Sequence, residues 1–135
     1  MQNTPPMKIV DGYLAIILDD SSQKELLRRY PSLYPKVFAH HVTIAFKPLV
    51  EVYEHYEKYL GSPVTLTAYG YAKDEKAEAI LVGADIFKDE HFHITLSTNG
   101  VAPVYSNALI QKGYETIPEP FTLQAKFEFI KHERK

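Results

Sequence analysis

The chain has 135 residues, of which 45% are apolar and 24% are charged, a composition typical of one globular domain with its own core. The formal net charge is −2 and no basic stretch precedes the last five residues, which disfavours a protein that holds long duplex nucleic acid. Cysteine is absent, so disulfides, thiolate nucleophiles and cysteine-based zinc sites are excluded. The N-terminus lacks a signal-peptide pattern, and no apolar run reaches the roughly 20 residues of a membrane span. We expect one domain over 1–135, with flexible ends at 1–10 and 131–135, in a monomeric cytoplasmic protein.

The first half of the chain predicts two strands, each followed by a helix. The expected elements are a strand at 13–18, a helix at 22–30, a strand at 41–46 and a helix at 50–60. Ser21 or Ser22 can cap the first helix, and Pro31 ends it. Gly61 is the expected stop of the second helix.

The second half predicts mainly strands. The expected elements are strands at 64–72, 77–84 and 92–97, a short helix at 106–112 and a final strand at 121–130. The polar turn at 73–76 indicates a hairpin, and a loop rich in Gly, Pro, Ser and Asn covers 99–107. This mixed order without a linker predicts an α+β fold around one concave sheet.

A histidine and a threonine two residues apart occur twice, as His41 with Thr43 and as His93 with Thr95. In each copy an aliphatic residue separates the two and another follows. Because successive side chains of a strand point to opposite faces, the histidine and threonine share one face and the aliphatic residues share the other. One such pair is common in strands and carries little weight. Two copies in the same context predict one shared site if the two strands lie side by side.

A metal site is the alternative interpretation of these histidines. His91 and His93 would share a strand face, and His41 could supply a third imidazole. The motif strands contain no carboxylate to complete or orient such a set, and threonine hydroxyls are poor zinc ligands. We therefore expect no metal and no other cofactor.

The remaining histidines have no expected catalytic role. Strand alternation predicts that His40 points away from His41. His91 is expected at the rim of the site or without a function. His55 lies in a glutamate-rich helical segment and His132 lies in the tail, and both are expected to be solvated.

Three residues outside the motifs are candidate substrate-binding residues. Tyr105 follows the second motif strand, and it could stack on a base, donate to a phosphate oxygen or simply pack in its loop. Tyr13 lies in the opening strand, and Lys47 directly follows the first motif strand.

With its paired motifs the sequence resembles the 2H phosphoesterase superfamily, which is named for two His-x-Thr/Ser motifs. The resemblance covers nearly the whole chain and includes 12–16, the phrase His-Val-Thr-Ile-Ala-Phe-Lys-Pro at 41–48, and 101–109. The last stretch is similar to the cyclic phosphodiesterase domain of fungal tRNA ligases. The resemblance implies a compact, bilobal, pseudo-twofold α+β fold with concave antiparallel sheets and central motif strands. It also implies metal-independent chemistry, and the two motif histidines are only 52 positions apart, which requires compact lobes.

The expected function is hydrolysis of a cyclic or 2′-linked phosphodiester in a nucleotide or at an RNA 3′ end. One of His41 and His93 would act as base and the other as acid, because a pKa of about 6.5 suits both roles. Thr43 and Thr95 would donate to the non-bridging phosphate oxygens. Candidate substrates are RNA 2′,3′-cyclic phosphate ends, ADP-ribose 1″,2″-cyclic phosphate and cyclic di- or trinucleotides. The alternative is a non-catalytic module that sequesters a cyclic nucleotide with the same residues.

Overall fold

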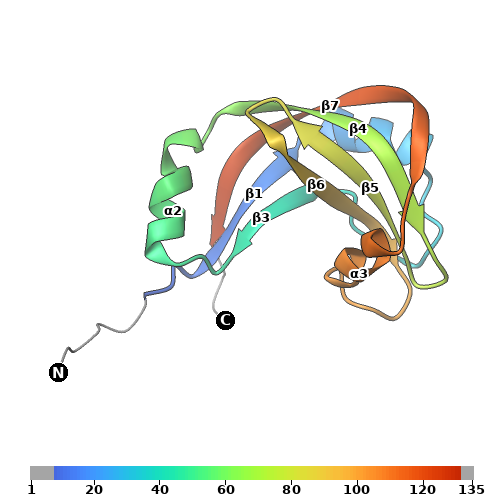
Figure 1. The fold of residues 1–135 in the computed structure, drawn as a ribbon, viewed down its shortest axis with the longest axis horizontal. Coiled ribbons are helices and arrows are strands. Elements are labelled where there is room, and N and C mark those ends of the chain that lie inside the picture. The colour runs from blue at the N-terminus through green and yellow to red at the C-terminus, as the bar shows by residue number, and fades with distance from the viewer. Residues whose placement is uncertain (1–7, 132–135) are drawn as a thin grey trace.

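The computed structural model describes residues 8–131, which form one seven-stranded antiparallel sheet and three α-helices (Figure 1). The strands are β1 (Gly12–Leu18), β2 (Lys36–Val37), β3 (His41–Phe46), β4 (Pro63–Lys73), β5 (Ala77–Ala84), β6 (Phe87–Thr98) and β7 (Glu115–Lys131). The helices are α1 (Asp20–Arg29), α2 (Val50–Tyr56), a 3-10 turn at Glu57–Tyr59 that continues α2, and α3 (Tyr105–Gln111). The strand order is β2-β6-β5-β4-β7-β1-β3. The α+β class expected from the sequence is confirmed.

The sheet curves until its two ends meet (Figure 1). The chain between β2 and β3 makes this connection. The backbone N–H of Ala39 donates to the carbonyl oxygen of Thr95 in β6 at 2.8 Å, and the carbonyl oxygen of His40 accepts from Leu18 in β1 at 3.0 Å. Consecutive residues therefore bond first to one end of the sheet and then to the other. As a result β3 and β6, which stand far apart in the strand order, lie close together in space.

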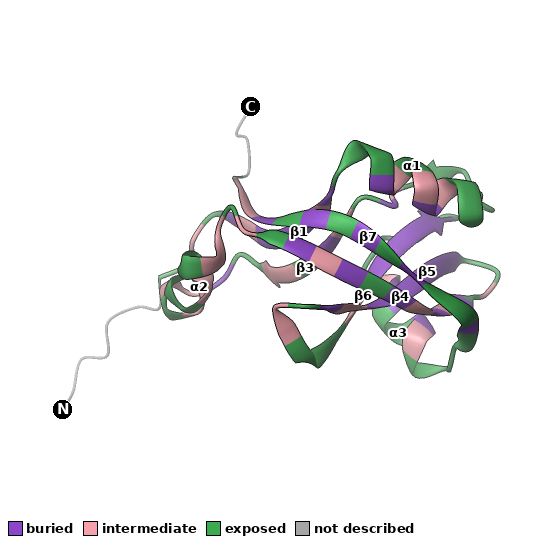
Figure 2. Ribbon diagram, turned by 90° about the horizontal axis from the view of Figure 1, so that it is seen from above, coloured by how far each residue is buried: buried purple, intermediate pink, exposed green. Residues whose placement is uncertain are grey.

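The apolar core covers the sheet face opposite the motif side chains. Fully or almost fully buried side chains on this face include Leu14, Ile16, Val42, Ile94 and Leu96. Burial of each such side chain stabilises the fold by about 1.5–3 kcal/mol. The helices α1 and α2 pack against this core with one face. The helix α3 lies on the other face of the sheet, where Leu109 packs with Ala79 and Leu81. The outer faces of α1 and α2 are largely exposed (Figure 2).

Aromatic side chains extend this core under α2. The Tyr56 ring packs against Phe127 of β7 at 5.9 Å and against Phe87 of β6 at 5.7 Å between centroids. Aromatic pairs at such spacings add about 0.5–1.5 kcal/mol beyond the area they bury. One helix thus joins two strands that are not neighbours in the sheet.

Several element boundaries differ from the sequence-based expectation. The first helix begins two residues earlier, because the carboxylate of Asp19, not Ser21 or Ser22, accepts the capping bond from the backbone N–H of Ser22 at 2.7 Å. The Ser22 hydroxyl instead accepts from the backbone N–H of Gln124 at 2.7 Å. The two-residue β2 was not expected, and β6 and β7 begin earlier than predicted. These extensions follow from pairing with neighbouring strands, which local sequence does not encode.

The single sheet predicted from the order of the elements is confirmed, whereas the several sheets with central motif strands that the resemblance implies are not found in this part of the chain, 8–131. A single sheet is formed by the described residues, β3 is an edge strand, and β6 is bordered on its outer side only by the short β2. The motif strands meet because the sheet curves and not because they occupy its middle.

The expected flexible ends lie mainly outside the described residues, at 1–7 and 132–135. Of the rest, Ile9 forms an isolated bridge with Leu49, and Lys131 pairs with Gly12 in the sheet. No helix within 8–131 combines the length and the apolar character needed to cross a membrane.

Candidate active site

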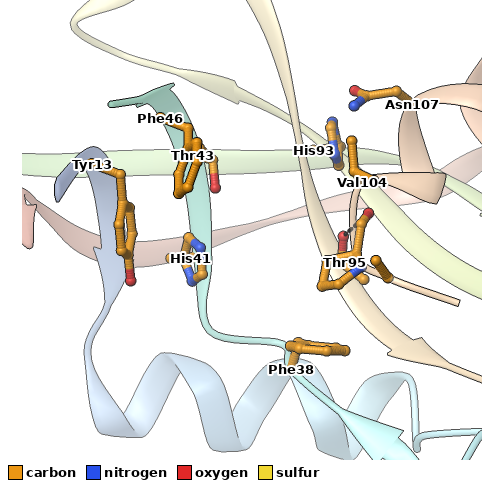
Figure 3. A pocket seen from close by; sticks show the side chains of 11 residues that line it. Tyr13, Phe38, His41, Thr43, Phe46, His93, Thr95, Val104 and Asn107 are labelled. Atoms are coloured by element: carbon orange, nitrogen blue, oxygen red, sulfur yellow. Dashed lines mark hydrogen bonds between the residues drawn. The ribbon is translucent and has the colours of Figure 1, made fainter. Parts of the chain in front are cut away.

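A cavity of about 680 Å³ lies where β3 and β6 face each other (Figure 3). Its lining consists of Tyr13, Phe38, His41, Thr43, Phe46, His93, Thr95, Ala102, Pro103, Val104 and Asn107. Both histidines and both threonines of the repeated motif are therefore brought to one cavity. They come from opposite walls, with the first pair on β3 and the second on β6 (Figure 3).

Strand alternation directs these side chains to the cavity. In β3, Val42 separates the two motif residues and is 1% exposed on the core face. In β6, Ile94 occupies the equivalent position and is fully buried. Each buried aliphatic residue fixes the register of its strand, because a slip of one residue would expose it and bury the histidine.

His41 has two aromatic neighbours. Its ring centroid lies 5.5 Å from that of Tyr13 on β1, and its Nδ1 lies 3.0 Å from Nδ1 of His40. Burial is the main cause that lowers the pKa of His41 to about 4, and repulsion from His40 is the second. The imidazole is therefore neutral in the free protein at pH 7.

The expectation that His40 points away from His41 is wrong. His40 precedes β3, and the residue before it, Ala39, has a φ of 46° in the left-handed region. This conformation costs a residue with a side chain roughly 1–2 kcal/mol. His40 itself lies in the bend before β3, where strand alternation does not hold, and its ring contacts that of His41.

His93 faces the cavity from β6 and is half-buried. Burial lowers its pKa as well. On this side of the cavity, the loop before α3 contributes Val104, and α3 itself contributes Asn107 (Figure 3). Both catalytic candidates are thus neutral imidazoles that a bound anion would make more basic.

The two threonines differ in environment. Thr43 is exposed, whereas Thr95 is 9% exposed and its Oγ1 lies 2.8 Å from Oγ of the buried Ser106. Thr95 Oγ1 also lies 3.4 Å from the carbonyl oxygen of Pro103. If Ser106 donates to Thr95, the Thr95 hydrogen can turn from this long contact to a phosphate oxygen in the cavity.

The structure brings one of the three additional candidates to the cavity. Tyr13 lines it, but Tyr105 and Lys47 do not. The Tyr105 hydroxyl donates to the carboxylate of Asp74 at the turn between β4 and β5. Lys47 places its Nζ 5.8 Å above the ring of Phe46 at the edge of the cavity.

His91 also lies outside the cavity lining. Its Nδ1 is 2.9 Å from the Tyr69 hydroxyl, and its side chain is exposed. Across residues 8–131 we find no group of three or more His, Cys, Asp or Glu side chains arranged to hold a metal ion.

Sequence reasoning missed most of the apolar lining. Phe38 reaches the cavity from the segment that closes the sheet, and Phe46 from the end of β3. The loop 102–104 and Asn107 fall within the stretch 101–109 that supported the family resemblance, so a signal existed without an assigned role. The position of Phe38 depends on the closure of the sheet, which no local pattern reveals.

No protein-family model matches the sequence, and no curated protein is similar enough to it to count as a relative.

Proposed function

We propose that this protein is a phosphodiesterase that opens a cyclic or 2′-linked phosphodiester of a nucleotide or an RNA 3′ end without a metal ion. The observation that carries the proposal is the convergence of His41, Thr43, His93 and Thr95 on one cavity. Two imidazoles on opposite walls can take up and deliver a proton on opposite sides of a phosphorus atom. This arrangement suits in-line displacement.

The proposed reaction is hydrolysis with one proton transfer on each side. Nε2 of one histidine accepts a proton from water while the water oxygen bonds to phosphorus. The bond between phosphorus and the leaving ribose oxygen breaks, and that oxygen receives a proton from the other histidine. The product is a linear phosphate ester, and solvent returns the two histidines to their starting protonation states.

Hydroxyl groups would bind the charge that develops on the non-bridging oxygens. None of the described residues that line the cavity is Lys, Arg, Asp or Glu, so Thr43 and Thr95 would act as neutral donors, with Tyr13 and Asn107 as the other donor side chains of the lining. In a cavity that excludes much of the bulk water, such hydrogen bonds are stronger than in solution.

Membership of the 2H phosphoesterase superfamily, in the branch of the tRNA-ligase cyclic phosphodiesterases, belongs to this proposal. So does a pseudo-twofold relation between two lobes, one built around β3 and the other around β6. The His-x-Thr pairs on these two strands support both inferences. The proposal needs no cofactor and includes a cytoplasmic location for the protein.

A substrate panel tests the proposal directly. The purified protein is incubated with nucleoside 2′,3′-cyclic phosphates, an oligoribonucleotide with a 2′,3′-cyclic end, ADP-ribose 1″,2″-cyclic phosphate and cyclic di- and trinucleotides. Chromatography of the products should show a linear ester from at least one compound, with EDTA present. Recovery of every compound intact, with tight binding of one, would instead indicate sequestration.

Substitution of the histidines tests the mechanism. His41→Ala and His93→Ala should each lower kcat/KM by about 10²–10⁴, the usual contribution of acid–base catalysis. The control is His91→Ala, since His91 is an exposed histidine of β6 outside the cavity lining. Circular dichroism and thermal unfolding establish that each variant is folded. Full turnover by either cavity variant would exclude the mechanism.

A further inference from the structure

The contact between His40 and His41 has a direction that the proposed chemistry determines. Two nitrogens 3.0 Å apart form a hydrogen bond only if one of them carries a proton. A neutral imidazole carries its proton on either Nδ1 or Nε2. The protonation state of His41 therefore decides which residue donates.

Only one direction is compatible with catalysis by His41. As a base, His41 needs an unprotonated Nε2, so its proton is on Nδ1. As an acid, His41 carries protons on both nitrogens, and Nδ1 is again protonated. In the remaining state Nδ1 accepts from His40 and Nε2 holds the proton, so that Nε2 can neither accept a proton nor act as a strong acid. In both useful states, His41 donates from Nδ1 to His40.

Resting on the function proposed above, we propose that His40 is a positioning residue that accepts a hydrogen bond from Nδ1 of His41 and so presents Nε2 of His41 to the cavity as the general base. His93 is then the general acid. Many catalytic histidines use a carboxylate as this partner, and a carboxylate favours the imidazolium form. An imidazole acceptor has no negative charge, so it can orient the His41 ring without favouring the imidazolium form. Such a partner suits a base that must be unprotonated before it reacts.

The backbone supports this assignment. Ala39 is fully buried in the bend before β3, and the two imidazoles that follow it are in contact, with ring centroids 5.2 Å apart. Ala39 is held there by its hydrogen bond to Thr95, a cavity residue of the opposite wall. The segment that joins the two walls thus also brings His40 to His41.

The two histidines of the cavity are unequal in their surroundings. His41 has a second imidazole beside it, which opposes its protonation, whereas burial alone lowers the pKa of His93. The titratable groups on the same sheet face near His41 are Tyr13 on β1, His93 on β6, and Lys126 and Glu128 on β7. From α1, the neutral amide of Gln23 donates to the carbonyl oxygen of Phe38 in the closing segment, at 3.4 Å. Among these neighbouring groups, His40 is therefore the one whose removal should change the pKa of His41 most.

Nitrogen NMR of the free protein tests the hydrogen bond without any substrate. The ¹⁵N shifts of His41 distinguish a protonated from an unprotonated ring nitrogen, and Nδ1 should carry the proton in the wild type. In His40→Ala this preference should be lost, and in His91→Ala it should be kept. A wild-type His41 protonated on Nε2 alone would overturn the proposal, whatever the activity of the protein.

The pH profile of kcat/KM tests the assignment of roles. His40→Ala should lower kcat/KM by about 10- to 100-fold, the usual effect of removing a group that orients a functional histidine. The ascending limb of its pH profile should move to higher pH, because the charge repulsion from His40 that lowers the pKa of His41 is removed. His40→Asn keeps an acceptor at the position of Nδ1 but cannot be protonated. His40→Asn should therefore restore kcat/KM, while the ascending limb of its pH profile should stay at the higher pH seen in His40→Ala.

The outcomes separate this proposal from the function on which it rests. A shift of the descending limb in place of the ascending one would make His41 the acid and overturn the assignment. An unchanged rate and profile in His40→Ala, in an enzyme that does hydrolyse the substrate, would overturn the role of His40 alone. Absence of hydrolysis with any substrate would contradict the proposed function, while the NMR result would still decide the hydrogen bond.

Discussion

The two threonines of the site perform the same proposed task in different surroundings. Thr43 is exposed, but the hydroxyl of Thr95 lies 2.8 Å from the buried Ser106 hydroxyl. Thr43→Val and Thr95→Val should each lower kcat by about 10²–10³, the usual effect of removing one donor to a developing oxyanion. Steady-state kinetics measures this loss on the best substrate of the panel.

Stability should separate the same two variants. Thr95→Val leaves the buried Ser106 hydroxyl without its partner and should lower the free energy of unfolding by about 1–3 kcal/mol. Thr43→Val removes an exposed hydroxyl and should leave the free energy of unfolding nearly unchanged. Thr95→Ser is the matched control because it retains the hydroxyl. Equal stability losses in the two valine variants would contradict the environments described for these threonines.

At the scale of elements, α3 is held over the sheet by its contact with the β4–β5 turn. The Asp74 carboxylate accepts from the Tyr105 hydroxyl, from Lys112 at 3.3 Å and from two backbone N–H groups of its own turn. Burial opposes ionisation of Asp74, but these hydrogen bonds outweigh it and lower its pKa to about 2. The loop before α3 and Asn107 of α3 line the cavity. The contact between α3 and the β4–β5 turn therefore positions part of the site.

Tyr105→Phe distinguishes a structural from a substrate-binding role of Tyr105. We expect a loss of about 1 kcal/mol in the free energy of unfolding, since one hydrogen bond is removed at a partly buried position. KM should change little, because the side chain does not line the cavity. Chemical denaturation and steady-state kinetics give both values. A large rise in KM at unchanged stability would restore the substrate-binding role predicted from sequence.

Element prediction succeeded where the signal was local. The strands at 41–46 and 77–84 were predicted with their observed bounds, because apolar runs between turn residues suffice to identify them. The two-residue β2 has no such pattern and exists because it pairs with β6.

The role of Glu78 was also missed. This fully buried carboxylate accepts from the Tyr71 hydroxyl at 2.7 Å and from the backbone N–H of Leu33 at 2.9 Å.

At the scale of the whole molecule, one topological feature determines the site. The two His-x-Thr strands, one at an end of the strand order and the other next to the opposite end, form one cavity only because the sheet curves until its ends meet. The sequence shows that each pair shares a strand face, which follows from alternation. It does not show how the faces meet, and so Phe38, His40 and Asn107 could not be placed beforehand. His40 is the clearest case, because it lies in the bend before β3, where the alternation used to predict its direction does not apply.

The lowered pKa values of the cavity histidines make the stability of the whole fold depend on pH. His41 titrates near pH 4 in the folded chain and near 6.5 when unfolded, and the pKa of His93 is also lowered. Between these values the unfolded chain binds more protons than the folded one, so stability increases with pH in this range. The contribution is fully present above pH 6.5 and is lost as pH falls towards 4.

Urea unfolding at a series of pH values tests this linkage. The urea concentration at the unfolding midpoint of the wild type should decrease as the pH is lowered from 7 to 4.5. Carboxylates also begin to titrate in this range. His41→Ala should show a smaller fall over the same interval, because the unfolded chain then has one fewer proton to gain. The comparison between the two proteins isolates the histidine from the carboxylates that they share. An equal or steeper fall in His41→Ala would mean that burial in the cavity does not hold this imidazole neutral, and the case for His41 as a resting base would lose its physical support.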